Sequence, residues 1–422
     1  MSATTFSLEG KALRLDTASD VGKHISPLTS SYETITKIDL SGNTISPHAA
    51  DALAPHLSKL TALETANLGD IFTSRDITEI PPALDALLTA LLPLKNLHTV
   101  ILNDNAFGLR TQAPLVNFLE KHVPLRHLIL NNNGLGPAAG TLIANALTRL
   151  AEAKKAAQGG KVTYLETIVC GRNRLESGSS AAWAEALEAH SPSLRELRMT
   201  QNGIRVEGMT AIVRQGLRHA KKLQVLDLQD NLFTVPGAQA LVDVLGGWTE
   251  LKELSVQDTL LRARGGMLLV EILAKGHNKQ LEMLRLQYNE INAKGVAALL
   301  HAAKTALPKL QRVELNGNMF SEEDPSVEAL GELLSQRREE AGAEPDDEAW
   351  GLDELDELDD EEEDEEEDDE AEENDNDEDE DDVEVKAEKE LQLADQAENQ
   401  KVSQKQDDDV DDLAEALGKT HV

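Results

Sequence analysis

The sequence has a single cysteine, Cys170, and only 3% aromatic residues among 422. One cysteine excludes a disulfide framework and a cysteine-built metal site, so the composition favours a reducing compartment. Residues 1–15 lack a basic start followed by an apolar run, and the longest apolar stretches, near residues 86–94, fall short of the roughly 20 residues that a membrane-spanning helix needs. These absences predict an intracellular protein without a secretion signal or a membrane span.

Motifs of catalysis and metal binding are also missing. The 11 histidines show no HExxH spacing, no GxxxxGK[ST] or GxGxxG segment follows an expected strand, and the three tryptophans are scattered. We therefore expect no metal, no cofactor and no nucleic acid on this chain.

Negative charge is concentrated near the C-terminal end. The net charge is -37, and 29 acidic residues without a lysine or arginine lie between Glu344 and Asp382. Such a segment repels itself and buries little. The sequence thus predicts a folded domain over 1–340, an acidic disordered segment over 341–383, and a polar tail over 384–422 with a short helix near 408–418. Within the acidic segment, the apolar pattern Leu352, Leu355 and Leu358 is typical of a recognition or export signal.

A short pattern recurs through the first domain. In LRHLILNNNGL, which begins at Leu125, apolar residues occupy relative positions 0, 3, 5 and 10, and asparagine occupies position 8. A degenerate copy at residues 12–21 comes before the regular ones. The regular copies start at Ile35, Leu63, Leu97, Leu125, Leu165, Leu194, Leu223, Leu251, Leu281 and Leu310.

The spacing of these copies, mostly 28 to 30 residues, accommodates one short strand and one helix per repeat. The sequence therefore predicts an α/β fold, a leucine-rich-repeat solenoid of about eleven repeats with strands on the concave face and helices on the convex face. Cys170 occupies the inward position 5 of its repeat, so we expect it in the core.

Positions 7 and 8 of the repeat have different expected roles. A position-8 asparagine can bond loop backbone groups that a short strand leaves unpaired. Position 7 stands one residue earlier and is expected to point outward along one rim. The ladder asparagines are Asn43, Asn105, Asn133, Asn173, Asn202, Asn231, Asn289 and Asn318. The position-7 residues are Gly42, Asp70, Asp104, Asn132, Arg172, Gln201, Asp230, Asp258, Tyr288 and Gly317.

Two repeats are longer than the others. The repeat from Leu63 inserts about six residues, in a loop around Arg75, and has Ile71 in the ladder position. The repeat from Leu125 inserts about eleven, over residues 151–164, which predict an extended helix and a glycine-rich turn in solvent. Because insertions in solenoids often mark the binding face, the Arg75 loop and the position-7 residues are the candidate binding surface.

The segments IFTSRDITEIPPAL around Arg75, LNNNGLGPAAG, CGRNRLE and LDLQDN, in this order and before a Glu/Asp run, resemble the Ran GTPase-activating protein family in its fungal form. The resemblance covers residues 1–340 and the tail. It departs from the family just after Arg75, where Asp76, Ile77 and Thr78 replace the basic residues that are usual there.

The resemblance implies an activator of GTP hydrolysis on the small GTPase Ran, not an enzyme in its own right. The expected partner is Ran in its GTP form, with a Ran-binding protein as a further partner, and GTP and magnesium would be held by Ran. We expect a monomer in the cytoplasm, with shuttling or attachment at the nuclear envelope as alternatives.

The resemblance also implies roles for individual residues. Arg75 matches the essential loop arginine of the family and is expected to be catalytic, either by contacting the phosphates or by anchoring the loop; the sequence does not separate these two roles. Asn132 matches the asparagine that orients Ran's own glutamine against the attacking water, in a mechanism without an inserted arginine finger. By match and by rim position, we expect contacts with Ran at Asp104, Arg172, Asp230 and Asp258.

Two other classes of protein combine similar features. A non-catalytic scaffold such as the ribonuclease inhibitor has repeats of the same length, but it is rich in cysteine. Acidic histone-binding chaperones join an acidic tail to fewer and shorter repeats. Eleven long repeats with one cysteine favour the activator over both.

Overall fold

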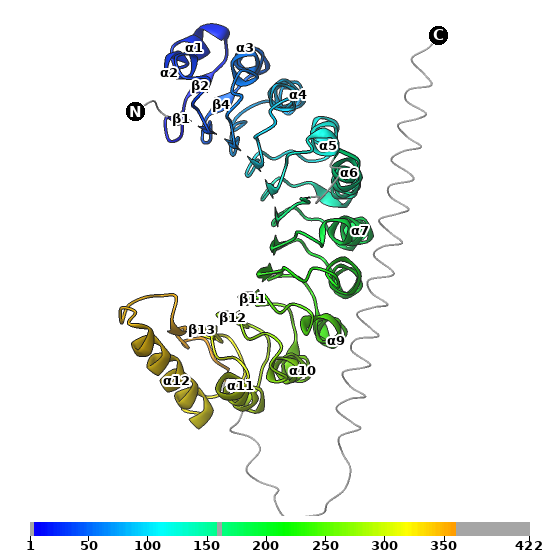
Figure 1. Cartoon of the computed structure of the whole chain (residues 1–422). Helices are drawn as coiled ribbons and strands as arrows, with labels where there is room; N and C mark the ends of the chain where they lie inside the picture. The colour runs from blue at the N-terminus through cyan, green and yellow to red at the C-terminus, as the bar shows by residue number, and fades with distance from the viewer. Residues whose placement is uncertain (1–3, 158–162, 360–422) are drawn as a thin grey trace, which may run out of the picture. The chain divides into compact units, whose positions relative to one another are not determined.

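A computed structural model describes residues 4–157 and 163–359, and these residues form an arc of stacked repeats. Twelve parallel strands line the inner side of the arc in sequence order, and helices cover its outer side (Figure 1). The predicted α/β leucine-rich-repeat solenoid is therefore confirmed. All strands of the sheet run in the same direction, so their C-terminal ends and the loops that follow form one edge, which we call the rim.

Most strands are three residues long. The sheet strands are β1 (Thr5–Ser7), β3 (Lys37–Asp39), β5 (Thr65–Asn67), β6 (Thr99–Ile101), β7 (His127–Ile129), β8 (Thr167–Val169), β9 (Glu196–Arg198), β10 (Val225–Asp227), β11 (Glu253–Ser255), β12 (Met283–Arg285), β13 (Arg312–Glu314) and β14 (Gly351–Leu352). Neighbouring strands pair without a register shift, so equivalent repeat positions stand side by side, as with Leu128 opposite Ile168.

One helical segment follows most strands. The outer helices are α3 (Pro47–Leu57), α4 (Ile80–Leu91), α5 (Gln112–Lys121), α6 (Gly136–Ala157), α7 (Ser180–His190), α8 (Val206–Ala211) with a π-helical turn at Ile212–Gly216, α9 (Thr234–Leu245), α10 (Arg262–Ala274), α11 (Ala293–Thr305) and α12 (Pro325–Ala341). Smaller elements are α1 (Ala18–Gly22), α2 (Ser26–Thr29) and a 3₁₀ turn at Ser177–Ser179. Within the described ranges, none of the helices combines the length and the apolar character of a bilayer span.

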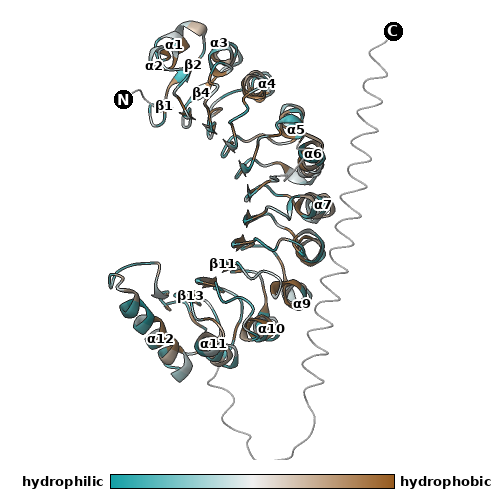
Figure 2. Cartoon of the chain, viewed as in Figure 1, coloured by the Kyte–Doolittle hydropathy of each residue, from teal (hydrophilic) through white to brown (hydrophobic). Residues whose placement is uncertain are grey.

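The core lies between the sheet and the helices. Residues at positions 3 and 5, such as Leu128 and Leu130, are buried, and the helices carry both hydrophobic and hydrophilic ribbon in Figure 2, as elements with one buried side do. Cys170 is 1% exposed, and its burial raises the pKa of the thiol to about 12. The thiol therefore stays protonated and packs as a small apolar group, as its repeat position predicts.

The first repeat begins earlier than the sequence predicts. Its sheet strand is Thr5–Ser7, whereas the expected degenerate copy at residues 12–21 contains Arg14–Leu15, a short strand (β2) that pairs with Thr44–Ile45 (β4) in a separate two-stranded sheet. The register was missed because a lysine, Lys11, occupies the ladder position of the true first repeat.

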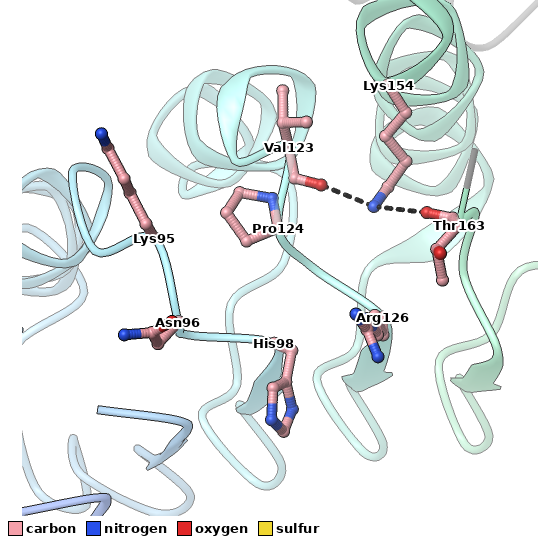
Figure 3. Close-up of a pocket in the computed structure, with 8 residues that line it drawn as sticks. All are labelled: Lys95, Asn96, His98, Val123, Pro124, Arg126, Lys154 and Thr163. Atoms are coloured by element: carbon pink, nitrogen blue, oxygen red, sulfur yellow. Dashed lines mark hydrogen bonds between the residues drawn. The ribbon is translucent and has the colours of Figure 1, made fainter. Parts of the chain in front are cut away.

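The insertion in the repeat from Leu125, which the sequence places in solvent, is partly buried. Helix α6 runs to Ala157, as predicted, but Lys154 near its end is 1% exposed. Its ammonium group donates to the carbonyls of Val123 at 2.6 Å, Leu125 at 2.5 Å and Thr163 at 3.2 Å, at the edge of a shallow cavity (Figure 3). The lysine thus fastens the inserted segment to its own repeat. The expected glycine-rich turn lies mostly at 158–162, outside the described residues.

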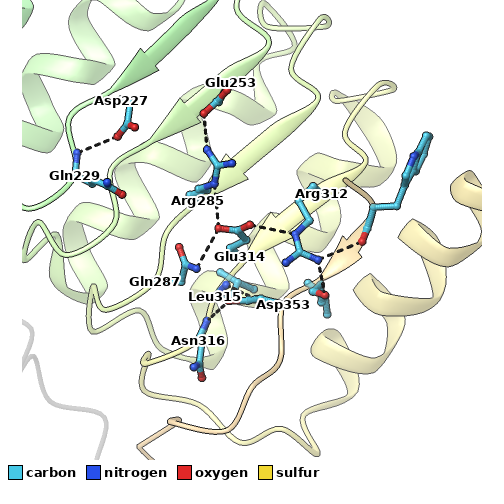
Figure 4. A network of polar contacts seen from close by, with 12 residues as sticks. Asp227, Gln229, Glu253, Arg285, Gln287, Arg312, Glu314, Leu315, Asn316 and Asp353 are labelled. Carbon is cyan, nitrogen blue, oxygen red and sulfur yellow. Dashed lines mark hydrogen bonds and ion pairs between the residues drawn. The ribbon is translucent and has the colours of Figure 1, made fainter. Parts of the chain in front are cut away.

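The folded domain extends beyond the predicted boundary at residue 340. Strand β14 pairs with β13, and the Asp353 carboxylate accepts hydrogen bonds from the backbone N–H groups of Leu315 at 2.7 Å and Asn316 at 3.0 Å (Figure 4). The residues at 343–359 therefore form the C-terminal cap of the solenoid, and the boundary at 341 is wrong. The remainder of the acidic segment, the polar tail and the helix expected near 408–418 lie outside the described residues.

The apolar pattern in this cap also has a different role from the one expected. Leu352, Leu355 and Leu358 pack against the hydrophobic core, so the prediction that they form a free recognition or export signal is wrong. Apolar residues spaced by three in an acidic context serve here to close the open end of the sheet.

We predict that the cap, and not the acidic tail, stabilises the domain. A protein ending at Asp359 should unfold at the same urea concentration as the full chain, because the highly charged segment that it lacks buries little. A protein ending at Gly342 should lose at least about 2 kcal/mol of unfolding free energy, because it lacks the three leucines and the Asp353 bonds. Equal urea midpoints for the two truncated proteins would contradict the role of the cap.

Candidate functional site

The eight ladder asparagines lie in the interior and bond the repeat before their own. In each case the side-chain N–H donates to the carbonyl of position 5 in the preceding repeat, as from Asn133 to Leu102 at 3.0 Å. The side-chain oxygen accepts from the backbone of that repeat, as from Asn105 N–H to Asn133 at 3.0 Å. None of the eight is more than 5% exposed. The ladder thereby satisfies backbone groups that three-residue strands leave unpaired.

The residue before each ladder position turns outward in a left-handed backbone conformation. All ten position-7 residues have φ between 47° and 70°, and we call them the rim column. Glycine, asparagine and aspartate adopt this conformation readily, which accounts for Gly42, Gly317 and many of the others. Arg172, Gln201 and Tyr288 are less suited to it. The sequence pattern placed this column on the rim but gave no sign of its backbone conformation.

Asp104 and Asn132 are brought together on the rim. They are exposed neighbours in the column, and the Asn132 side-chain N–H donates to the Asp104 carboxylate at 2.8 Å. The bond fixes the orientation of the Asn132 amide relative to Asp104. Asn133, one residue later, is fully buried in the ladder. The two asparagines thus occupy the different environments that their repeat positions predict.

Arg75 lies in the oversized loop after β5, but its side chain points into the protein. The guanidinium group is 4% exposed and pairs with Asp16 at 2.6 Å. It also donates to the Thr44 hydroxyl at 2.8 Å and to the carbonyls of Thr44 at 3.0 Å and Leu15 at 3.1 Å. These partners belong to the first two repeats, whereas Asn132 lies two strands away in the opposite direction. Arg75 therefore contributes to the packing of the N-terminal repeats, although its loop lies on the rim.

The other expected contacts lie further along the rim column. Arg172 is exposed beside the repeat of Asn132, and Asp230 and Asp258 follow in adjacent repeats. Asp230 and Asp258 occupy neighbouring positions of the column. Burial and the negative charge of Asp230 raise the pKa of Asp258. The column therefore has an amide and a guanidinium in its middle part and an acidic part toward β11.

The concave face of the C-terminal half is a less suitable binding surface. Its arginines are already paired: Arg285 contacts Glu253 and also Glu314 at 3.1 Å, and Arg312 contacts Glu314 at 3.2 Å (Figure 4). Charges that neutralise one another within the sheet offer little attraction to a partner. The rim, where polar groups such as Asn132 and Arg172 are exposed, is the better candidate.

The fold and the rim define a leucine-rich-repeat protein with a column of polar residues at the C-terminal ends of its strands. Three segments, 190–213, 219–242 and 277–300, match a family described as Leucine Rich repeat. Ran GTPase-activating protein 1 of Saccharomyces cerevisiae is 39% identical over 332 residues, which cover 77% of this chain and 81% of that protein. The chain belongs to the Ran GTPase-activating protein family.

More distant relatives share parts of this similarity. The Ran GTPase-activating protein of Drosophila melanogaster is 33% identical over 321 residues, 75% of this chain and 52% of that protein. The ribonuclease inhibitor of Sus scrofa is 27% identical over 343 residues, 78% of this chain and 68% of that protein. The similarity to the ribonuclease inhibitor therefore covers about as much of this chain as the similarity to the yeast protein, but the sequence identity is lower.

We predict that Arg75→Ala destabilises the protein. Loss of the guanidinium removes the donor to the Thr44 carbonyl and one of the two donors to the Leu15 carbonyl, which keeps the Ser46 N–H at 2.9 Å. It also removes a largely buried charge and leaves Asp16 unpaired by it, so the unfolding free energy should fall by about 2 to 4 kcal/mol. Arg75→Lys should recover only part of this loss, because an ammonium group can keep the Asp16 pair but not the planar set of contacts. Urea unfolding measures both, and an alanine variant as stable as wild type would show that the contacts contribute nothing.

Proposed function

We propose that this protein, an activator of GTP hydrolysis on Ran, acts on Ran in its GTP form by orienting Ran's own catalytic glutamine with Asn132. GTP hydrolysis requires little covalent chemistry from a protein and depends on positioning the attacking water and stabilising charge. The observation that carries the proposal is the exposed Asn132 amide, fixed on the rim by Asp104.

The geometry of this amide supports the orienting role. With its nitrogen bonded to Asp104, the Asn132 oxygen is left to accept from the side-chain N–H of a glutamine. That bond would turn the glutamine oxygen toward the water. An amide does this at neutral pH without a charge that would repel the phosphates. Asp104 is then a positioning residue, since it determines which end of the Asn132 amide faces Ran.

Arg75 supports the same reaction from within the protein. Its guanidinium group is bonded to Asp16, Thr44 and Leu15, so it would have to give up these contacts to reach a phosphate. We therefore assign it a positioning role: it holds the oversized loop beside the part of the rim that carries Asp104 and Asn132. Loss of activity on its substitution would follow from displacement of this loop.

Arg172, Asp230 and Asp258 extend the proposed Ran-binding surface along the rim column. We place the activity in the cytoplasm, with the protein as a monomer and with a Ran-binding protein as an additional partner. A scaffold like the ribonuclease inhibitor would bind without stimulating hydrolysis. Phosphate release from Ran-GTP with catalytic amounts of protein separates the two functions, because a scaffold would leave the intrinsic rate unchanged.

We predict that Asn132→Ala and Asn133→Ala separate catalysis from stability. Asn132→Ala should leave the urea midpoint nearly unchanged and slow single-turnover hydrolysis at saturating protein, because the lost bond acts mainly in the transition state. Asn133→Ala should lower the unfolding free energy by about 1 to 3 kcal/mol, because it leaves the buried Asn105 backbone N–H without its acceptor.

Two outcomes would contradict this prediction. An Asn132→Ala protein with wild-type hydrolysis at saturation would remove the orienting mechanism. An Asn133→Ala protein that is stable but inactive would mean that the buried asparagine, not the exposed one, acts on Ran.

We predict that glycine substitution isolates the side-chain function of Arg172. Glycine occupies the same column position at Gly42 and Gly317, and its ease in the left-handed conformation offsets its entropy cost, so stability should change by less than about 1 kcal/mol. Arg172→Gly should nevertheless weaken binding of Ran-GTP about tenfold, as loss of a charged interface contact does.

Gln201→Gly is the matched control, since Gln201 is also exposed, left-handed and in the next repeat. It should match wild type in both stability and binding. Equal binding by the Arg172 and Gln201 variants would remove Arg172 from the interface.

A further inference from the structure

Large apolar side chains are unevenly placed on the surface. Four of them stand out as exposed among the described residues: Ile77 at 46%, Leu109 at 54%, Leu142 at 37% and Tyr288 at 45%. Leu142 is on helix α6, on the outer side of the arc, whereas the other three are on the rim. Single exposed apolar residues are common on protein surfaces. Ile77 and Leu109 differ because they stand on neighbouring loops, after β5 and β6.

The two loops are held together beneath these residues. The rings of Phe72 and Phe107, both buried, pack 6.4 Å apart between them. The backbone N–H of Ile71 donates to the ladder residue Asn105 at 2.9 Å. The pKa of Asp76 is lowered mainly by its hydrogen bonds from Thr78 and to a smaller extent by the charge of Arg110. Ile77 and Leu109 therefore stand on a joined pair of neighbouring loops.

Local hydrogen bonds also keep the Ile77 side of this pair in shape. Asp76 accepts from the Thr78 backbone N–H at 2.8 Å, and the Asp76 N–H donates to Glu79 at 3.1 Å. Arg75 fixes the adjacent backbone from within. A loop held in this way exposes Ile77 without the freedom to bury it, so the side chain is preorganised for a partner.

The Leu109 side is joined directly to the proposed catalytic part of the rim. The backbone N–H of Gly108 donates to the carbonyl of Asn133 at 3.0 Å, one residue from Asn132, and Asp104 precedes the Leu109 loop. A partner that contacts Asn132 therefore meets Leu109 and then Ile77 along the rim toward the N-terminal repeats.

We infer that Ile77 and Leu109 form an apolar docking pair for Ran itself, continuous with the part of the rim that carries Asn132. This inference rests on the proposed rim interface and adds to it a source of affinity that is independent of charge. Exposed apolar side chains next to a polar centre are the usual composition of such contacts. Two charged residues border the apolar contact: Asp76 precedes Ile77 and Arg110 follows Leu109 in the sequence.

The test compares Ile77→Ser, Leu109→Ser and the double variant with Leu142→Ser as the matched control. Each rim substitution should raise the KM for Ran-GTP about tenfold, which corresponds to the loss of one buried aliphatic side chain, with kcat unchanged. Leu142→Ser should keep the KM of wild type. Ile77→Val and Leu109→Met should keep most of the affinity, and because all the side chains are exposed, thermal unfolding should be unchanged throughout.

A double variant with a KM within twofold of wild type would overturn the inference, as would a fall in kcat without a change in KM. If the wild-type protein failed to stimulate hydrolysis, the proposed mechanism would fall, and calorimetric binding to Ran loaded with a non-hydrolysable GTP analogue would decide the docking pair separately. Equal affinity of wild type and double variant in that measurement would overturn the inference as well.

Discussion

The structure depends on one kind of hydrogen bond, the one between a ladder asparagine and the backbone of the preceding repeat. Strands of three residues pair too few groups to hold a sheet of twelve, and the amide of a buried asparagine donates to and accepts from the loops that the strands leave open. Since every such asparagine must point inward, the residue before it has to turn the chain, and it does so in a left-handed conformation at all ten positions. The ladder thus stabilises the solenoid and presents the rim column.

As a result, adjacent residues of the repeat have different roles: the ladder residue stabilises the fold, and the residue before it is exposed. Asn133 is committed to the ladder, while Asn132 is exposed and makes no ladder bond. The left-handed backbone limits which residues suit the column, and asparagine and aspartate satisfy both the backbone and a polar interface. Arg172 suits a polar interface but is disfavoured by the left-handed backbone.

The periodic parts of the molecule could be predicted from sequence, and the non-periodic parts could not. The repeat frame gave the fold, the inward residues and the exposed column, because those depend on residues within one repeat. The environment of Arg75 depends on Asp16 and Thr44, 59 and 31 residues earlier in the chain, so no local pattern reveals that its side chain is buried. The C-terminal cap was missed because the charge of its segment hid three leucines and an aspartate that close the sheet.

The position of Arg75 has a consequence for how the rim works. Its contacts fasten the oversized loop to the first two repeats, while the ladder residue Asn105 and the packed rings of Phe72 and Phe107 fasten the same loop to the repeat that follows. A loop bound on both sides is fixed to its neighbours and is not free to close over a partner, so we expect binding on a surface that already has its final shape. In the proposed mechanism, such a preformed rim lowers the entropy cost of holding Ran's glutamine in place with the Asn132 amide.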